Sequence, residues 1–314
     1  MQKVQIAHTD LEVSRINFGA NVFGWTLDER QSFEILDALA EGGINFIDTA
    51  DTYSWWVNGV GGQSEAIIGK WLKSRGKRTQ MVIATKVGSE TQVHPKDISK
   101  QHILKSVDAS LQRLQTDHID LYYTHFDDNV TTVAETLEAY DEIIKAGKVR
   151  YIAASNVSPK RLLESFKVSE ENKLAKYVAL QPHYNLVERD HYESDYAPIV
   201  EKYGLSVMTY FSLASGFLSG KYRSTRDLSK SARGQSASRY LNPKGLQVIK
   251  ALDLVAEKHH SQVATVSLAW LLSRPHIAAP IVSATSQTQL QSLFDAPELK
   301  LDTEDLALLE TASK

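Results

Sequence analysis

Three polar residues of different chemistry stand where short apolar, strand-like runs of this sequence end. They are Asp48, Lys86 and His125, and Tyr53 lies five residues beyond the first of them. If the runs are neighbouring parallel strands, their carboxyl ends meet at one rim. A carboxylate, an ammonium, an imidazole and a phenol would then lie together as a titratable cluster able to transfer protons.

Each member of this cluster also has an ordinary explanation when it is considered alone. Asp48 could cap a turn, Lys86 could reach solvent and His125 could be a hydrogen-bonded core residue. These explanations are weaker for the set, because all three residues occupy the same position relative to a strand. The combination favours a functional site over three unrelated structural roles.

The elements that would position this cluster alternate in the order strand, helix, strand, helix. Helical apolar spacing occurs in residues 32–39, 103–114, 133–144 and 162–166, and the alternation around Val4 to Val13 predicts an N-terminal β-hairpin. This order predicts an α/β fold, a (β/α)8 TIM barrel with an N-terminal β-hairpin, although an open doubly wound sheet has the same periodicity. The eight strand candidates are Ile16–Phe18, Asn45–Asp48, Met81–Lys86, Ile119–Thr124, Val149–Ala154, Tyr177–Gln181, Ser206–Tyr210 and Ala279–Val282.

Two longer stretches, Thr52 to Gln63 and Phe211 to Pro243, interrupt the alternation and read as non-helical. Both follow strands, so in a barrel they lie at the C-terminal face, where ligand-binding groups collect. No repeat, linker or low-complexity tract divides the chain. We therefore expect one domain over residues 1–314.

Composition narrows the functional class. The chain has 314 residues, a formal net charge of −3 and no cysteine. The charge gives no support for a nucleic-acid or anionic-membrane partner, and the lack of thiols excludes disulfides and Cys-ligated metal. The N-terminus lacks the pattern of a signal peptide, and no apolar run approaches the roughly 18 residues that cross a bilayer. We expect a soluble, cytoplasmic protein with a small-molecule partner and an oligomeric state that the sequence leaves open.

The chain resembles the aldo-keto reductase family over nearly its whole length. The segment Gly43–Tyr53 is similar to the early signature of the family, and Gly62-Gln63-Ser64-Glu65 with Ile68-Gly69 is similar to its continuation. Ala84-Thr85-Lys86 and Tyr123-Thr124-His125 match the positions of the family's lysine and histidine. The resemblance implies a catalytic tetrad of Asp48, Tyr53, Lys86 and His125.

The resemblance also implies the reaction, which is reduction of aldehydes or ketones to alcohols with NADPH. The cofactor supplies the hydride, and the protein must supply a proton to the carbonyl oxygen. A tyrosine hydroxyl, with a pKa near about 10, holds its proton at neutral pH, and Lys86 would make Tyr53 a stronger acid. Asp48 would keep Lys86 charged, and His125 would donate a hydrogen bond to the substrate oxygen.

Cofactor contacts follow from the same resemblance. Ser155, Asn156 and Gln181 end two strands and are expected to bind the nicotinamide carboxamide, whereas Tyr210 is expected to stack on the nicotinamide ring. Turn chemistry and core packing are the alternatives for these positions. The expected pyrophosphate contacts are Ser212, Leu213, Ser215, Gly216, Gly220 and Lys221, and the expected adenosine contacts are Ser283, Thr285 and Gln289.

Local charge adds a preference for NADPH over NADH. Seven basic residues accompany one acid, Asp227, in the loop from Lys221 to Lys244, and arginine suits a 2′-phosphate better than a ribose hydroxyl. A solvated charged face is the alternative. The basic residues are Lys221, Arg223, Arg226, Lys230, Arg233, Arg239 and Lys244.

Three tryptophans, Trp25, Trp55 and Trp56, follow the first two strands and are expected to line the substrate pocket, with loop packing as the alternative. No metal site is expected, because the adjacent His259 and His260 lack a third ligand at a suitable spacing. The main rival function is an NADP-binding regulatory module with little or no catalysis, similar to the potassium-channel β subunits of the same fold. A barrel isomerase or lyase without nicotinamide is a third alternative.

Overall fold

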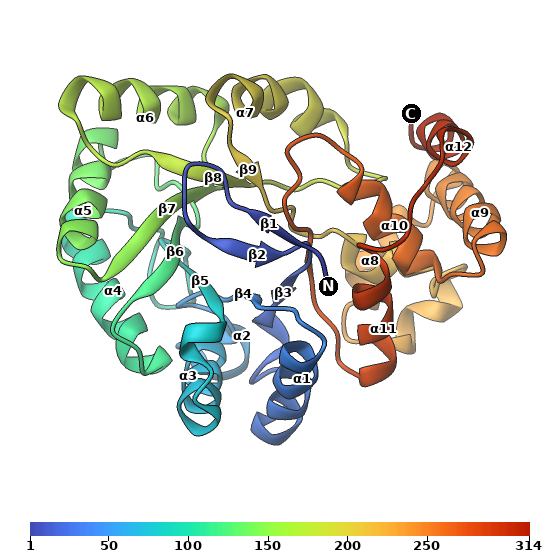
Figure 1. Ribbon diagram of the computed structural model, residues 1–314, viewed down its shortest axis with the longest axis horizontal. Coiled ribbons are helices and arrows are strands. Elements are labelled where there is room, and N and C mark those ends of the chain that lie inside the picture. Colours follow the sequence, from blue (N-terminus) through green and yellow to red (C-terminus); the bar gives the residue numbers. More distant parts are fainter.

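The computed structural model describes residues 1–314 apart from the side chain of Asn58, and it contains a ring of parallel strands surrounded by helices (Figure 1). The sheet order is β10-β3-β4-β5-β6-β7-β8-β9, and every neighbouring pair is parallel. Its strands are β3 (Asn17–Gly19), β4 (Phe46–Asp48), β5 (Val82–Val87), β6 (Ile119–Thr124), β7 (Val149–Ser155), β8 (Tyr177–Gln181), β9 (Ser206–Val207) and β10 (Ile281–Val282).

Backbone hydrogen bonds close the ring between β9 and the segment that leads into β10, which are the two ends of this sheet order. Val207 N donates to His276 O at 2.9 Å, and Ala278 N donates to Val207 O at 2.9 Å. Ile281 N donates to Thr209 O, also at 2.9 Å. Closure removes the free edges of the sheet and confirms the predicted (β/α)8 barrel.

The strands are buried on both faces, which is why they read as nearly continuous apolar runs. Successive side chains alternate between the interior of the barrel and the surrounding helices. Phe46, Ala84 and Leu121 belong to the interior core, while Ile83 and Tyr122 belong to the layer between strands and helices. The polar residues at the strand ends therefore continue an inward-facing row.

Most of the main helices begin at a residue whose side chain caps the first turn. Asp28 and Gln31 form a capping box at α1, and Ser99 and Ser158 cap α4 and α6. The predicted helical segments all fall inside helices. The main helices are α1 (Glu29–Glu41), α3 (Gln63–Arg75), α4 (Lys100–Leu114), α5 (Val133–Lys145), α6 (Pro159–Asn172), α7 (Ala197–Tyr203), α9 (Pro243–Lys258), α10 (Val263–Leu272), α11 (Gln287–Asp295) and α12 (Thr303–Ser313).

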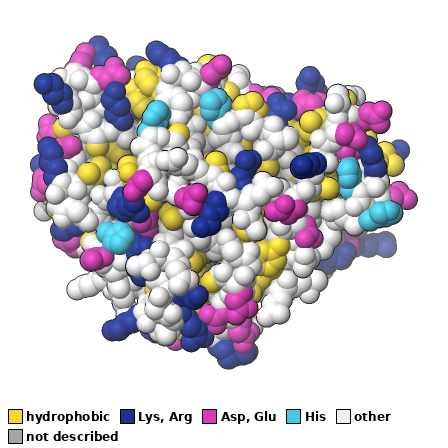
Figure 2. Space-filling model, viewed as in Figure 1, with side chains coloured by type: hydrophobic (Ala, Val, Ile, Leu, Met, Phe, Trp, Pro, Cys, Tyr) yellow, Lys and Arg dark blue, Asp and Glu magenta, His cyan; other side chains and the backbone are white. Residues whose placement is uncertain are grey.

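The predicted hairpin is present and covers the N-terminal end of the barrel, where it crosses the centre of the ring in Figure 1. It consists of β1 (Lys3–Gln5) and β2 (Glu12–Ser14), paired antiparallel. Arg150, on β7, ties it down by contacting Asp10 and the buried Asp120 at 2.8 Å each. Figure 2 shows acidic and basic side chains scattered together over this face. The open end of the barrel is therefore the opposite, C-terminal end.

Three local predictions need correction. The strand predicted over 206–210 is shorter, because only Ser206–Val207 form β9 and Tyr210 joins His183 through an isolated bridge. The stretch 52–63, predicted to be non-helical, contains the one-turn helix α2 (Trp55–Asn58). The stretch 211–243 contains four short helices, η4 (Ala214–Ser219), η5 (Thr225–Lys230), α8 (Gly234–Ala237) and η6 (Ser238–Tyr240). Helices of this length lack the repeated apolar spacing on which the prediction depended.

The described helices include none that is both long and apolar enough to cross a membrane.

Candidate active site

Lys86 lies at the centre of a hydrogen-bonded group at the C-terminal end of the barrel. Its ammonium donates to Asp48 Oδ2 at 2.5 Å, to Tyr53 Oη at 2.8 Å and to Thr49 O at 2.8 Å. Tyr53 Oη is also 3.4 Å from Asp48 Oδ2. The structure thus brings together three of the four residues of the predicted tetrad in direct contact.

Burial makes this ion pair strong. Lys86 is 0% exposed and Asp48 is 1% exposed, so water does not screen the two charges. Burial by itself lowers the pKa of Lys86, but Asp48 and Tyr53 together hold that pKa above its ordinary value. All three donor positions of the ammonium are used, so Lys86 remains a fixed cation beside the phenol.

The turn after β4 places Tyr53 over Lys86. Ser54 adopts a left-handed conformation with φ of 72°, and its hydroxyl donates to Phe23 O at 2.8 Å. Burial raises the pKa of Tyr53 above its ordinary value, and the opposing effect of Lys86 does not overcome it. The expected influence of Lys86 is therefore present, but desolvation outweighs it in the ligand-free protein.

His125 completes the group from the end of β6. Its ring meets that of Tyr53 edge to face, with centroids 5.9 Å apart. Burial, with a further contribution from Lys86, holds the pKa of His125 well below its usual value, so the ring is neutral. A neutral imidazole carries one N–H donor, and its Nδ1 atom is buried without a partner.

The residues predicted to bind the carboxamide lie beside the tetrad. Gln181 Nε2 donates to Asp48 Oδ1 at 2.9 Å, and Ser155 Oγ donates to Gln181 O at 2.9 Å. Asn156 Nδ2 donates to His125 O at 2.8 Å and contacts Ser155 Oγ at 3.1 Å. Tyr210 Oη donates to Asn156 Oδ1 at 3.0 Å. One network of hydrogen bonds thus joins the ends of β4, β6, β7 and β8.

The predicted pyrophosphate loop has an unusual backbone. Phe211, Ala214 and Ser215 have φ values of 50°, 48° and 58°, and Gly216 has a φ of 89°. Residues other than glycine seldom adopt this region. Ala214 N donates to Phe211 O at 2.7 Å and Gly216 N donates to Leu213 O at 2.8 Å, so within residues 214–216 only the N–H of Ser215 has no backbone acceptor and can bind an anion. Ser212 is instead turned inward, with its hydroxyl donating to Thr209 O at 2.8 Å. Its side chain is used within the protein.

The predicted adenosine contacts are engaged locally. Ser283 Oγ lies 2.7 Å from Gly19 O and 2.9 Å from Asn21 Oδ1, so its one hydroxyl proton is shared between these two acceptors. Thr285 N donates to Gln289 Oε1 at 2.8 Å, which holds the turn before α11. These contacts bring the ends of β3 and β10 together and leave Thr285 and Gln289 exposed on the surface.

The basic loop is less uniform than its sequence indicated. Arg223 pairs with Asp253 at 2.5 Å and Lys230 pairs with Asp227 at 2.7 Å, so both charges are neutralised locally. Arg233 folds inward, where Nη2 donates to Asn21 Oδ1 at 3.0 Å and the guanidinium lies 5.5 Å from the ring centroid of Trp25. In the described structure Arg233 has no carboxylate partner. Asn21 was not singled out in the sequence, and its position next to a strand end was the available signal.

The three tryptophans form one aromatic group beside Tyr53. Trp56 meets Trp25 edge to face at 5.5 Å and Trp55 at 6.3 Å, and the ring of Tyr53 lies 6.5 Å from that of Trp56. Trp56 is 42% exposed despite its size. The group therefore presents an apolar surface next to the proposed acid.

Asp51 is a residue of this region that sequence reasoning missed. Its Oδ1 atom is buried without a hydrogen-bond partner. Burial, reinforced by the charge of Glu65, raises the pKa of Asp51 to about 8. Glu65 is itself fully buried and paired with Arg113 at 2.6 Å. The only sequence signal was an acid next to an expected active-site turn.

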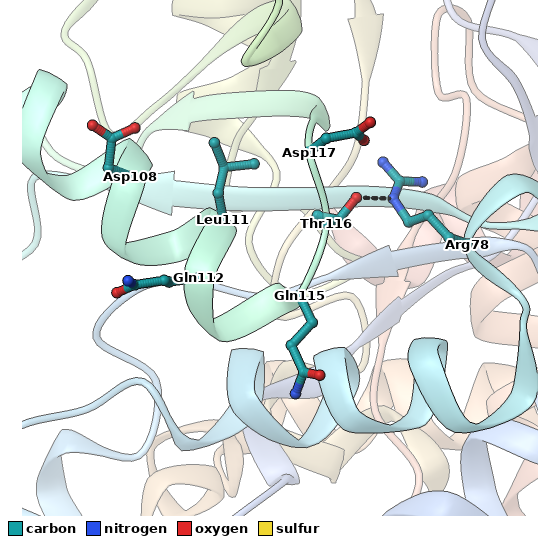
Figure 3. Close-up of a pocket in the computed structure, with 7 residues that line it drawn as sticks. All are labelled: Arg78, Asp108, Leu111, Gln112, Gln115, Thr116 and Asp117. Carbon is teal, nitrogen blue, oxygen red and sulfur yellow. Dashed lines mark hydrogen bonds between the residues drawn. The ribbon is translucent and has the colours of Figure 1, made fainter.

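A surface hollow elsewhere has no connection with this group (Figure 3). It lies against the C-terminal half of α4 and the turn before β6, at the N-terminal end of the strands. Of its charged lining residues, Arg78 is basic, and it is already held by Thr116 Oγ1 at 2.8 Å and Asp120 Oδ2 at 2.9 Å. No three His, Asp or Glu side chains of the described structure converge to hold a metal ion. The candidate site therefore remains at the C-terminal end.

Comparison with known proteins agrees with this geometry. Residues 15–314 match the Aldo/keto reductase family. The chain belongs to this family. An uncharacterised oxidoreductase of Bacillus subtilis, YrpG, is 36% identical over 98% of this chain and 95% of its own length.

Other relatives of this aldo/keto reductase carry different names. The aldo-keto reductase YhdN of Bacillus subtilis is 32% identical over 97% of the chain and 91% of its own length. A probable voltage-gated potassium channel β subunit of rice is 31% identical over 92% of the chain and 89% of its own length. Both an enzyme and a channel subunit are thus named among proteins of comparable similarity.

The arrangement in this aldo/keto reductase can hold a proton on Tyr53, keep a cation beside it and offer a neutral imidazole to an oxygen atom. An apolar aromatic surface lies on one side of these groups. A left-handed run of backbone, in which the N–H of Ser215 has no backbone acceptor, follows β9.

Proposed function

We propose that this protein reduces aldehydes or ketones to alcohols with NADPH, using Tyr53 as the proton donor. The observation that carries the proposal is the contact of the buried Lys86 ammonium with both Tyr53 Oη and Asp48 Oδ2. A buried ammonium beside a phenol stabilises the phenolate that remains when the proton has left. Lys86 is 0% exposed, so this contact is made without competing water.

Each residue of the group has a separate role in the reaction at the carbonyl oxygen. When bound, NADPH supplies the hydride that reaches the carbonyl carbon. Tyr53 gives its hydroxyl proton to the oxygen, and Lys86 compensates the charge left on the phenol. The neutral ring of His125 donates a hydrogen bond to the same oxygen as negative charge develops on it. Asp48 keeps Lys86 protonated and fixed.

The protein's own groups suit a nicotinamide dinucleotide phosphate. In the left-handed backbone at residues 214–216, the N–H of Ser215 has no backbone acceptor in the described structure and can be presented to a pyrophosphate. Arg233 supplies a guanidinium without a carboxylate partner in the described structure, near Trp25. Ser155, Asn156 and Gln181 supply amide and hydroxyl groups next to the tetrad. These features support the cofactor assignment.

The proposal is tested by following NADPH absorbance with a panel of aldehydes, ketones and sugars. Turnover of at least one carbonyl class, with an alcohol identified as the product, is expected. NADPH binding without turnover of any compound would favour the alternative that the rice relative suggests, an NADP-binding regulatory module. Failure to bind NADPH, measured by quenching of its fluorescence, would contradict both functions.

A further inference from the structure

We propose that His183 is a positioning residue for the cofactor, because it supports the ring of Tyr210 from behind and its charge sets the relative affinity for the reduced and the oxidised nicotinamide. This inference rests on the proposed function, in which the nicotinamide ring stacks on Tyr210. It gives a role in cofactor binding to a histidine outside the tetrad.

His183, Tyr210 and Phe211 form a group of three rings between the end of β8 and the loop after β9. The imidazole of His183 is stacked on the phenol of Tyr210, with ring centroids 5.3 Å apart and ring planes inclined by 17°. Phe211 meets both of these rings edge to face, with centroids 5.4 Å from each. Separations of this size are typical of favourable aromatic pairs. The backbone fixes the stack, because His183 and Tyr210 face each other in a parallel bridge and Tyr210 N donates to Pro182 O at 2.9 Å.

The stack leaves one face of Tyr210 for a ligand. The hydroxyl of Tyr210 donates to Asn156 Oδ1 at 3.0 Å, and the amide of Asn156 donates to His125 O at 2.8 Å, so the phenol is tied to the tetrad. In the described structure His183 is the only ring stacked on Tyr210. A nicotinamide that stacks on this phenol must therefore take the face that His183 does not cover. The imidazole, the phenol and the nicotinamide then form one stack of three rings.

Hydrogen bonds around Asn185 determine which nitrogen of His183 carries a proton. The side-chain oxygen of Asn185 accepts from the backbone N–H groups of Val187 at 2.9 Å and Glu188 at 3.0 Å. Its NH2 group therefore faces the other way, where it donates to Phe211 O at 2.9 Å and lies 3.4 Å from His183 Nε2. Because an NH2 group only donates, Nε2 is the accepting, unprotonated nitrogen. The imidazole is therefore neutral in this arrangement.

The charged and titratable groups around His183 also favour the neutral ring. Burial lowers the pKa of His183 below its usual value, and the charges of Arg239 and His191 add to this effect. The carboxylate of Glu188 opposes it without overcoming it. His183 therefore gains a positive charge only in acid, below the pH of about 6.5 at which an unperturbed histidine titrates.

The charge of His183 matters because the two forms of the cofactor differ in charge. The nicotinamide ring is uncharged in NADPH and positively charged in NADP+. A protonated imidazole behind Tyr210 repels the oxidised ring and has little effect on the reduced one. Acid should therefore raise the affinity for NADPH relative to that for NADP+, which favours the form that carbonyl reduction consumes.

The test measures the dissociation constants of NADPH and NADP+ at intervals from pH 5.5 to pH 8. NADPH is titrated by the quenching of its fluorescence, and NADP+ by competition with NADPH. The ratio of the two constants cancels the titration of the 2′-phosphate, which both cofactors carry. For the unaltered protein we expect the Kd of NADP+ divided by that of NADPH to rise at least about twofold from pH 8 to pH 5.5, as for one partly screened repulsion between charges.

Two variants separate the effect of the stack from that of the charge. His183→Phe keeps a ring against Tyr210 and cannot be protonated, so both affinities at pH 8 should stay within about twofold of the original and their ratio should not depend on pH. His183→Ala removes the ring, and both affinities should fall by about two- to tenfold, as for one lost aromatic pair. The matched control is His191→Phe, which removes the exposed neighbouring histidine and should keep the pH dependence.

A ratio that is independent of pH in the unaltered protein, or one that still changes with pH in His183→Phe, would overturn the inference and leave the proposed function intact. Unchanged affinities in His183→Ala would also overturn it, because Tyr210 would then need no support. If the unaltered protein does not bind NADPH, the proposed function fails and the inference fails with it.

Discussion

The ammonium of Lys86 donates a hydrogen bond of 2.8 Å to the hydroxyl of Tyr53, and no water can take its place because Lys86 is fully buried. This contact connects the end of β5 with the turn after β4. The charge next to the phenol is therefore built into the fold and does not depend on the solvent or on a flexible side chain. Both the catalytic activity and the stability of the protein should fall when the charge of Lys86 is removed.

Lys86→Met should reduce both activity and stability. The variant leaves the Asp48 carboxylate buried without its cation, which typically costs about 3–5 kcal/mol. Carbonyl reduction should fall by about 10² or more, because Tyr53 loses the charge that stabilises its phenolate. Urea unfolding and steady-state kinetics measure the two effects. Adding Asp48→Asn should restore much of the stability but none of the activity; recovery of activity in the double variant would show that Lys86 acts only structurally.

The buried carboxyl of Asp51 predicts a pH dependence of stability. Folding raises the pKa of Asp51 to about 8, so the folded protein binds this proton more tightly than the unfolded chain, whose pKa is near about 3.9. This contribution to stability is fully present below about pH 4 and is lost as the pH rises toward 8, by at most about 1.4 kcal/mol per pH unit.

Asp51→Asn should remove that dependence. Denaturant unfolding at intervals from pH 5 to pH 9 should give a free energy that declines with pH in the unaltered protein and declines less steeply in the variant. Asp302→Asn is the control, because this exposed acid has a lowered pKa and its neutralisation should not remove the decline. Parallel profiles for the unaltered protein and Asp51→Asn would exclude a raised pKa at this position.

The aromatic group beside Tyr53 predicts a substrate preference. Trp55→Ala and Trp56→Ala should each lower kcat/KM for aromatic aldehydes relative to small aliphatic ones by about two- to tenfold, the usual contribution of an aromatic pair. Leu254→Ala removes an exposed apolar side chain from the distant helix α9 and should leave the ratio unchanged. A ranking that survives both tryptophan changes would place the substrate pocket elsewhere.

Cofactor preference should favour NADPH by about tenfold in kcat/KM, as expected from one charge-assisted hydrogen bond to the 2′-phosphate. Because the basic loop is largely solvent-exposed, the ratio of kcat/KM for NADPH to that for NADH should decrease as salt is added. Arg223 and Lys230 already pair with acids, so Arg226→Ala should reduce the preference more than Arg223→Ala does. Equal use of NADH at low salt would remove the loop from cofactor recognition.

The barrel and the tetrad could be predicted from the sequence for one physical reason. Strands buried on both faces give apolar runs, and each run ends where the chain reaches the polar rim, so Asp48, Lys86 and His125 mark that rim by themselves. The spacing could not give the pKa of Tyr53, because that depends on how far burial outweighs the nearby ammonium. That balance is set by the three-dimensional packing around the phenol.

Contacts between residues far apart in the chain could not be predicted from the sequence either. Gln181 and Asp48 are separated by 133 positions along the chain, and nothing in either segment indicates that their side chains form a hydrogen bond. For the same reason, the count of basic residues in the loop overstated how many of its cations are free to bind a phosphate. Its charges could be counted, but the pairing of Arg223 with Asp253 and the inward turn of Arg233 depend on tertiary packing.

Single-turnover reduction of an accepted aldehyde by bound NADPH, compared between the unaltered protein and Tyr53→Phe, tests the central claim most directly. The variant keeps the ring and loses only the hydroxyl, so NADPH affinity should be nearly unchanged while the rate falls by about 10² to 10⁴. Fluorescence quenching by the variant verifies that the cofactor still binds. A Tyr53→Phe protein that reduces the aldehyde at nearly the original rate would show that the proton comes from another group and would contradict the account.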